Sequence, residues 1–315
     1  MCSSDLARFG RAADAYGEAL ARRDIGLTMP RRAVSARGPR VVLPDELPYA
    51  EVGRLDPEGR GDVLAELRPG RAVRLSPFLL RVTAPNPGMM TGPGTNTYVV
   101  GDASGCVVVD PGPEDAAHLQ AVLAAAPGPV RRILVTHTHV DHSPGAAALA
   151  AATGAPVLGR RPAFAAGQDT TFQPDEELAG GERLAVAPGA TLRVIHTPGH
   201  ASNHLCYLLE EEKTLLTGDH VMQGSTVVIN PPDGDMVAYL AALNALLDED
   251  LQWFAPGHGF LVAQPHAVVR ALVQHRLRRE AKVAAALKAA GAAALDELLP
   301  RVYDDVPPGL HPVRS

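Results

Sequence analysis

Aromatic residues make up only 4% of the 315-residue sequence, so a buried core must be filled mainly by Ala, Val and Leu. Cysteine is scarcer still. The only three are Cys2, Cys106 and Cys206; they form no CxxC pair, and the last two lie inside apolar, strand-like runs. This usage excludes a disulfide scaffold, which is dense in paired cysteines. We expect buried free thiols and a reducing compartment.

Long apolar runs and a basic excess are missing as well. No uninterrupted run approaches the roughly 18 residues that a membrane span needs, and the N-terminus lacks the hydrophobic core of a secretory signal. We therefore expect a cytoplasmic protein with no membrane contact. Because the formal net charge is -6, binding of nucleic acid would have to rest on a local patch. With 46% hydrophobic and 20% charged residues, the composition is that of a globular protein.

The pattern of apolar runs divides the chain into three parts. Residues 1–40 form a charged, Ala-rich segment to which we assign no role. Residues 41–264 begin with short strand-like runs and continue with alternating strands and helices, which is typical of a layered α/β domain. Residues 265–315 contain a long helical pattern at 266–290 and a second predicted helix at 295–302. This last part is an appended helical region.

One short segment concentrates metal-binding residue types. His137, His139, Asp141 and His142 fall within six positions, in the sequence HTHVDH directly after the apolar run RRILV. A loop at the end of a strand lets such side chains converge on one point. A single HxH would be an ordinary feature. Four imidazole and carboxylate groups at this spacing are typical of a metal site, with Zn favoured and Fe or Mn as alternatives.

Three further residues repeat a local pattern of apolar strand, small turn residues and ligand. They are His200 in the sequence TPGH, Asp219 in TGD and His258 in PGH. Each alone would be ordinary turn chemistry, because Gly and Pro mark turns of many kinds. Together with the HTHVDH segment they indicate one metal site.

With these motifs the sequence resembles the metallo-β-lactamase superfamily over roughly residues 41–262. The resemblance implies an α/β fold, a four-layer αββα sandwich, here with a C-terminal helical appendage. It also implies a site for two divalent ions, most simply two Zn2+. In that site His137, His139 and His200 hold the first ion, Asp141, His142 and His258 hold the second, and Asp219 bridges them.

The implied mechanism is hydrolysis by a metal-bridging hydroxide. Two divalent ions lower the pKa of a shared water from 15.7 to about 7, so a nucleophile exists at neutral pH. Asp141 would orient this hydroxide, and Asp219 would hold the ions together. His204 is our candidate for one further catalytic group, because it lies four residues beyond His200. An ordinary half-exposed histidine at a strand start is an equal alternative.

Ligating histidines also need partners for their second ring nitrogen. Thr136, Thr138, Asp110 and His204 are candidates that the sequence does not rank. Asp110, in the sequence VDPG, matches a superfamily motif that supports the site, but capping of a turn explains it equally well.

Within the superfamily the sequence is most similar to the beta-lactamase-like protein 2 group. The segments that carry this similarity are GPGTNTY at 92–98, TPGHASNH at 197–204, GDHVM at 218–222, PPDGDMVAYL at 231–240 and HRLRRE at 275–280. Members of the group include single-strand-specific endoribonucleases, and similar proteins are thioesterases for carrier-bound acyl chains. The group has a small winged-helix-like C-terminal module, and we expect residues 265–315 to be a reduced or a truncated form of it.

The resemblance implies a metal-dependent hydrolase and leaves its substrate open. We expect a phosphodiester such as single-stranded RNA, or a small ester or thioester. Glyoxalase-II-like or acyl-carrier thioesterase activity is the alternative to nuclease activity. A zinc β-lactamase of the commonest subclass would carry Cys in place of Asp219. A non-catalytic metal-binding scaffold is the alternative from another class, and the complete ligand set disfavours it.

A basic cluster on the long C-terminal helix bears on this choice. It consists of Arg276, Arg278, Arg279 and Lys282. These side chains could touch a phosphate or a carboxylate, but a charge run on an Ala-rich helix is more often a solvated face. We expect a solvated face. The sequence does not indicate an oligomeric state.

Overall fold

The computed structural model describes residues 68–304, with gaps at 89, 166, 224–225 and 292–293. The predicted N-terminal segment 1–40 and the residues after 304 lie outside the described part. The division of the chain into three parts therefore stays a prediction.

Seven strands form the first sheet, in the same order in space as in the chain. They are β1 (Ala72–Arg74), β2 (Leu79–Thr83), β3 (Asn96–Asp102), β4 (Gly105–Val109), β5 (Val130–Leu134), β6 (Val157–Gly159) and β7 (Glu176–Glu177). The strands from β1 to β4 pair antiparallel, and those from β4 to β7 pair parallel. Helices α3 (Ala116–Ala125) and α4 (Gly145–Thr153) connect the parallel strands.

Six strands form the second sheet, in the order β13-β12-β11-β10-β9-β8. They are β8 (Arg183–Ala187), β9 (Ala190–His196), β10 (Leu205–Leu209), β11 (Thr214–Gly218), β12 (Trp253–Pro256) and β13 (Val262–Ala263). Only β11 and β12 pair parallel, and the crossover between them contains helix α5 (Met236–Ala245). The side chain of Asp235 caps this helix by accepting from the backbone N–H of Ala238.

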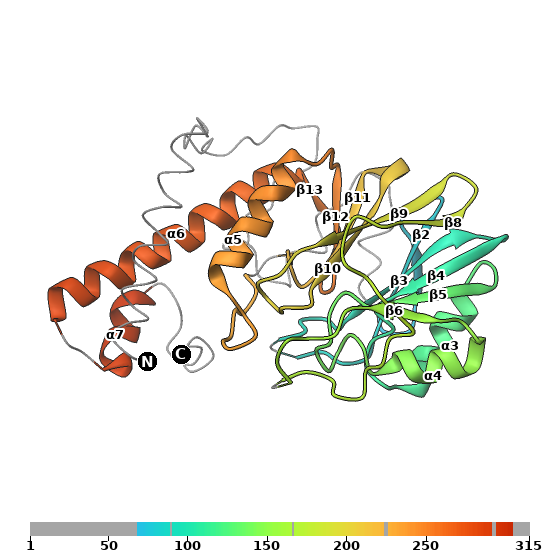
Figure 1. Ribbon diagram of the computed structural model, residues 1–315, viewed down its shortest axis with the longest axis horizontal. Helices are drawn as coiled ribbons and strands as arrows, with labels where there is room; N and C mark the ends of the chain where they lie inside the picture. Colours follow the sequence, from blue (N-terminus) through green and yellow to red (C-terminus); the bar gives the residue numbers. More distant parts are fainter. Residues whose placement is uncertain (1–67, 89, 166, 224–225, 292–293, 305–315) are drawn as a thin grey trace. The chain divides into compact units, whose positions relative to one another are not determined.

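The two sheets share one apolar core, and helices cover their outer faces. Along β3, Tyr98 and Val100 belong to the core between the sheets, whereas Val99 belongs to the outer cluster that α3 and α4 cover. This alternation is the period of two expected for a strand buried on both faces. In Figure 1, α3 and α4 lie beside β4–β6, and α5 and α6 (Pro265–Ala290) lie on the side of the second sheet. The predicted αββα sandwich is thereby confirmed.

The C-terminal helices α6 and α7 (Leu295–Val302) lie where the sequence predicts them. The expectation of a solvated basic face is wrong for half of the cluster. Arg276 donates to the backbone carbonyl of Val227, and Arg279 donates to that of Val302. Both guanidinium groups, on half-buried side chains, therefore bind the backbone of the protein. The sequence could not show this, because a long side chain can bend back onto apolar surface.

Two smaller expectations concern membrane contact and thiols. Within residues 68–304 as described, no helix is long and apolar enough to cross a membrane. Cys106 and Cys206 are buried free thiols, as predicted. Burial raises the pKa of the Cys206 thiol to about 12, so this group is an unreactive part of the core.

Candidate metal centre

Every predicted ligand lies in a loop that follows a strand. Four of them follow β5 of the first sheet, and His200, Asp219 and His258 follow β9, β11 and β12 of the second. A backbone hydrogen bond of 2.7 Å from Leu205 to Thr136 joins the start of β10 in the second sheet to the loop after β5 in the first. All seven residues are therefore brought to one end of the sandwich, where loops on a rigid scaffold commonly form active sites.

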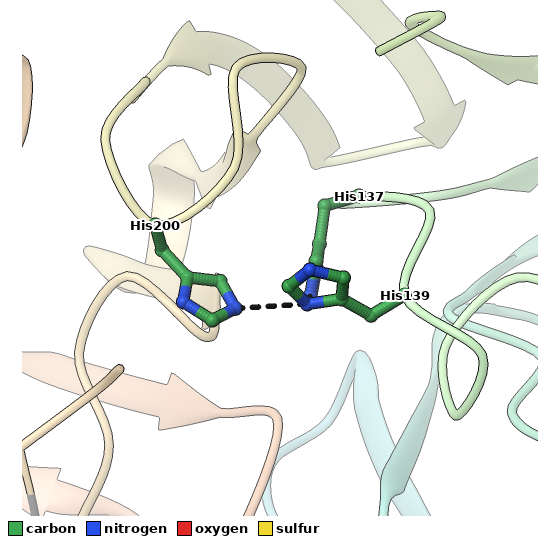
Figure 2. Close-up of side chains that lie close together, drawn as sticks. All are labelled: His137, His139 and His200. Carbon is green, nitrogen blue, oxygen red and sulfur yellow. Dashed lines mark hydrogen bonds between the residues drawn. The ribbon is translucent and has the colours of Figure 1, made fainter. Parts of the chain in front are cut away.

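Three imidazole nitrogens meet in the first cluster. His139 Nδ1 lies 3.0 Å from His137 Nε2 and 3.0 Å from His200 Nε2. Figure 2 shows the three rings pointing toward one another, two from the loop after β5 and one from the loop after β9. Three converging imidazoles are a common ligand set for a divalent transition metal.

The second cluster contains two carboxylates and two imidazoles. Asp141 Oδ2 lies 3.4 Å from His142 Nε2 and 3.3 Å from His258 Nε2. Asp219 Oδ1 lies at the same two distances from these nitrogens, and its Oδ2 lies 3.7 Å from His200 Nε2. The Asp219 carboxylate therefore faces both clusters.

Backbone carbonyls determine the tautomer of two ring systems. His200 Nδ1 lies 2.6 Å from the carbonyl oxygen of Val228, and His258 Nδ1 lies 3.2 Å from that of Gly94. A carbonyl only accepts, so each Nδ1 must carry its proton. The Nε2 atom of each neutral ring is then a lone pair that faces the clusters, which is the form that binds metal.

The Asp110 carboxylate holds the loop after β5 in place through hydrogen bonds. Its Oδ1 accepts from the backbone N–H of Thr136 at 2.7 Å, and its Oδ2 accepts from the Thr136 hydroxyl at 2.7 Å. Oδ2 also faces His142 Nδ1 at 2.9 Å, and the Thr136 hydroxyl faces His137 Nδ1 at 3.0 Å. Of the candidates that the sequence could not rank, Asp110 and Thr136 are therefore the partners of ligand rings. Thr138 instead donates to Gln168.

Burial keeps the first cluster neutral. It lowers the pKa of His137, His139 and His200; nearby histidines lower that of His137 and His139 further, to about 4 for His139, whereas Asp219 opposes the shift of His200. Neutral imidazole is the ligating form, so no proton has to be removed before a cation binds.

In the second cluster the carboxylates raise the pKa of the histidines instead. Burial alone would lower the pKa of His142 and His258, but Asp141 and Asp219 outweigh it and raise that of His258 to about 9. Burial alone would likewise raise the pKa of the two carboxyl groups, but the histidines hold both values low. The carboxylates are therefore ionised and draw positive charge into the cluster.

Two atoms of the second cluster test whether a cation fits. His142 Nε2 and Asp219 Oδ1 are buried and have no hydrogen-bond partner, although they lie 3.4 Å apart. A buried ring nitrogen and a buried carboxylate oxygen without partners are costly unless a proton or a metal cation lies between them. The residues present therefore fit divalent metal ions with nitrogen and oxygen ligands.

His204, the predicted further catalytic group, lies behind Asp219. It is fully buried, its Nδ1 lies 2.9 Å from the Thr197 hydroxyl, and its Nε2 accepts from the backbone N–H of Asp219 at 3.1 Å. Both ring nitrogens are thus used by the protein. This geometry favours positioning of Asp219, and a direct catalytic role stays a prediction.

Two polar residues of the site were missed by reasoning from the sequence. The Thr95 hydroxyl donates to Asp141 Oδ2 at 3.0 Å. Gln168 accepts from Thr138 at 2.7 Å and donates to Asp233 at 2.9 Å, so it joins three loops around the ligands. Thr95 lies in the GPGTNTY segment, which was a usable signal. Gln168 lies in a stretch with no recognisable motif.

Gly257, the residue before His258, lies against two ligands of the second cluster. A Cβ atom there would lie 2.7 Å from Asp219 Oδ1 and 2.8 Å from His142 Cε1. We expect Gly257→Ala to displace these side chains and to weaken metal binding about tenfold or more. Dialysis against metal, followed by metal analysis per chain, measures this. Gly154→Ala is the control for backbone strain: its φ of +71° is unfavourable for an L side chain, but a Cβ there meets nothing within 4 Å, so stability should fall while metal affinity is kept. Equal metal affinity in both variants would contradict the arrangement.

Comparison with known proteins defines the class to which this fold and site belong. The family model described as the metallo-beta-lactamase superfamily matches residues 90–258. An atrochrysone carboxyl ACP thioesterase of Aspergillus chevalieri is 34% identical over 245 residues, which cover 74% of this chain and 76% of that protein. A thioesterase of Emericella nidulans is 32% identical over 228 residues, which cover 71% of this chain and 62% of that protein.

Solved structures agree on the fold. A beta-lactamase domain protein from Burkholderia ambifaria has a TM-score of 0.63 and 20% identity, over 76% of this chain and 86% of its own. A metallo-beta-lactamase family protein from Thermus thermophilus has a TM-score of 0.56 and 24% identity, over 73% of this chain and 90% of its own. The chain belongs to the metallo-beta-lactamase superfamily and is a hydrolase. These relatives are named thioesterases rather than members of the beta-lactamase-like protein 2 group, so that narrower assignment stays a prediction.

Proposed function

We propose that the protein hydrolyses an acyl thioester. The proposal rests on the exposure of one aliphatic side chain. Val140 lies in the sequence between the candidate ligands His139 and Asp141 and is 65% exposed. An exposed aliphatic group at this point suits an acyl chain and offers nothing to a phosphate. The thioesterase names of the relatives support the same substrate class.

We propose that two divalent ions, most simply Zn2+, occupy the site. His137, His139 and His200 would hold one, Asp141, His142 and His258 the other, and Asp219 both, because its two oxygens face the two clusters. Bound there, the ions would polarise the acyl carbonyl and make water a better nucleophile at neutral pH.

The chain's own residues would orient the reaction. Hydrolysis adds the oxygen of water to the acyl carbon and breaks the carbon–sulfur bond, giving an acid and a thiol. Asp141 is ionised, is held by the Thr95 hydroxyl and is the more exposed of the two aspartates, so it would accept a hydrogen bond from the attacking water. His204 would fix the backbone of Asp219 from behind.

Single-stranded RNA is the second candidate, and it rests on the likeness to the beta-lactamase-like protein 2 group. The structure weakens it, because Arg276 and Arg279 of the basic cluster bind backbone carbonyls of the protein. The buried thiols suit a reducing compartment, so the cytoplasm remains the proposed location.

A substrate panel tests the proposal. Metal-loaded protein is assayed on a carrier-bound acyl thioester, an acyl glutathione and a single-stranded RNA, with chelated protein as the control. We expect metal-dependent release of free thiol from the carrier-bound substrate. Cleavage of RNA alone would replace thioester hydrolysis with nuclease activity. Hydrolysis of none, with metal bound, would favour a metal-binding scaffold.

A further inference from the structure

Helix α6 lies beyond the residues that the family model matches, yet one of its side chains returns toward the metal centre. Arg276 donates a hydrogen bond to the backbone carbonyl of Val227. Its guanidinium carbon also lies 5.5 Å from the centre of the Tyr239 ring of α5, a distance at which a cation and an aromatic face attract each other. Arg276 therefore joins α6, α5 and the segment that contains Val227.

That segment carries the partner of one candidate ligand. The next carbonyl along the chain, that of Val228, faces His200 Nδ1 at 2.6 Å. Residues 226–230 belong to no helix or strand, so no sheet or helix ladder holds this carbonyl in place. Arg276 binds the carbonyl of Val227, one residue before Val228, and so restrains the position of the Val228 carbonyl.

Tyr239 holds His200 from the other side. Gly199 packs so closely on α5 that a Cβ atom there would lie 2.3 Å from Tyr239 Cα, and its φ of +137° is one that L side chains rarely adopt. The residue before His200 therefore rests on the backbone of Tyr239. The ring of the same tyrosine contacts the guanidinium of Arg276.

We propose that Arg276 is a positioning residue for His200. It holds the Val227 peptide and the Tyr239 ring, so that the Val228 carbonyl keeps the proton on Nδ1 and the lone pair of Nε2 directed at His137 and His139. This inference rests on the proposed metal site. It makes the C-terminal helix part of the centre, although α6 contributes no ligand.

The chemistry of arginine suits this task. A planar guanidinium can donate in its plane and stack on an aromatic face at the same time, which an ammonium group does less well. Arg276→Met keeps most of the packing and removes the donor. Arg276→Lys keeps one charged donor and loses the planar guanidinium. Arg278→Met, at a neighbouring position of the same helix, is the matched control.

The test measures metal binding, not only turnover. Chelator competition gives the affinity for each ion, and visible absorption of the cobalt(II)-substituted protein reports the ligand geometry. We expect Arg276→Met to lower the affinity for one of the two ions about 10- to 100-fold and to change the cobalt spectrum. Arg276→Lys should show a smaller loss in the same direction. Arg278→Met should match the parent protein in both measurements.

The outcomes separate this inference from the proposed function. Parent-like affinity and cobalt spectra in both Arg276 variants would overturn the positioning role, even if both melt at a lower temperature. If Arg276→Met does not fold, the Lys variant decides by the same two measurements. A parent protein that binds no metal would instead refute the proposed site itself.

Discussion

Asp219→Ala should abolish hydrolysis while the fold is kept. The Asp219 carboxylate lies between the two clusters, with Oδ1 3.3 Å from His258 Nε2 and Oδ2 3.7 Å from His200 Nε2. Alanine removes a carboxylate whose two oxygens face the two clusters. The residues of a catalytic site depend on one another, so the loss of one can remove most of the activity. We therefore expect kcat/KM to fall about 10^3-fold or more. Turnover of the thioester and metal content per chain measure the effect.

A matched aspartate shows whether the loss is specific. Asp250 pairs with Lys213 at 2.5 Å on the surface and its side chain is 76% exposed, so Asp250→Ala should leave turnover and metal content unchanged. Circular dichroism and the melting temperature show whether the Asp219 variant is folded. Parent-like turnover by folded Asp219→Ala would sink the assignment of the site. The same loss in His139→Ala would extend the result to the three-imidazole cluster.

The convergence of the seven candidate residues was predictable because each follows an apolar strand. A strand of a layered domain places its last residues at an edge, and Gly or Pro turns then direct the next side chain inward. The HTHVDH segment was sufficient to indicate a metal. The partners of the far ring nitrogens were not predictable. Val228 and Gly94 act through their carbonyl oxygens, which every residue has, so no residue type reveals them.

The fold was predictable where polarity alternates or apolar runs are bounded by turns. Helix α4 is hard to predict because its sequence, GAAALAAAT, has no polar face to reveal a period. Strand β8 is hard to predict for a related reason, since RLAVA is short and only partly buried. The role of Arg276 could not be predicted from the charge pattern of the sequence. Such a pattern shows which residues are basic but not which groups a flexible side chain contacts.

Asp110→Asn should weaken both metal binding and folding. Asp110 is 2% exposed and has a φ of 50°, a conformation that Asn tolerates well, so the substitution adds little backbone strain. The carboxylate accepts from Thr136 twice and faces His142 Nδ1. An amide has one acceptor oxygen and a donor group. If the new amide oxygen still accepts from the backbone N–H of Thr136, the side-chain amide nitrogen faces the Nδ1–H group of the His142 ring, so two donors oppose each other.

His142 must then move or shift its proton to Nε2, which faces Asp141 and Asp219 and would no longer offer a lone pair. We expect a 10- to 100-fold loss of metal affinity, about the size of other outer-shell changes. The unsatisfied buried donor should also cost about 1–3 kcal/mol of the free energy of unfolding. Asp115→Asn, at the N-terminal cap of α3, is the control, because Asn caps as well as Asp does. Parent-like metal affinity in Asp110→Asn would leave this residue with only the turn-capping role.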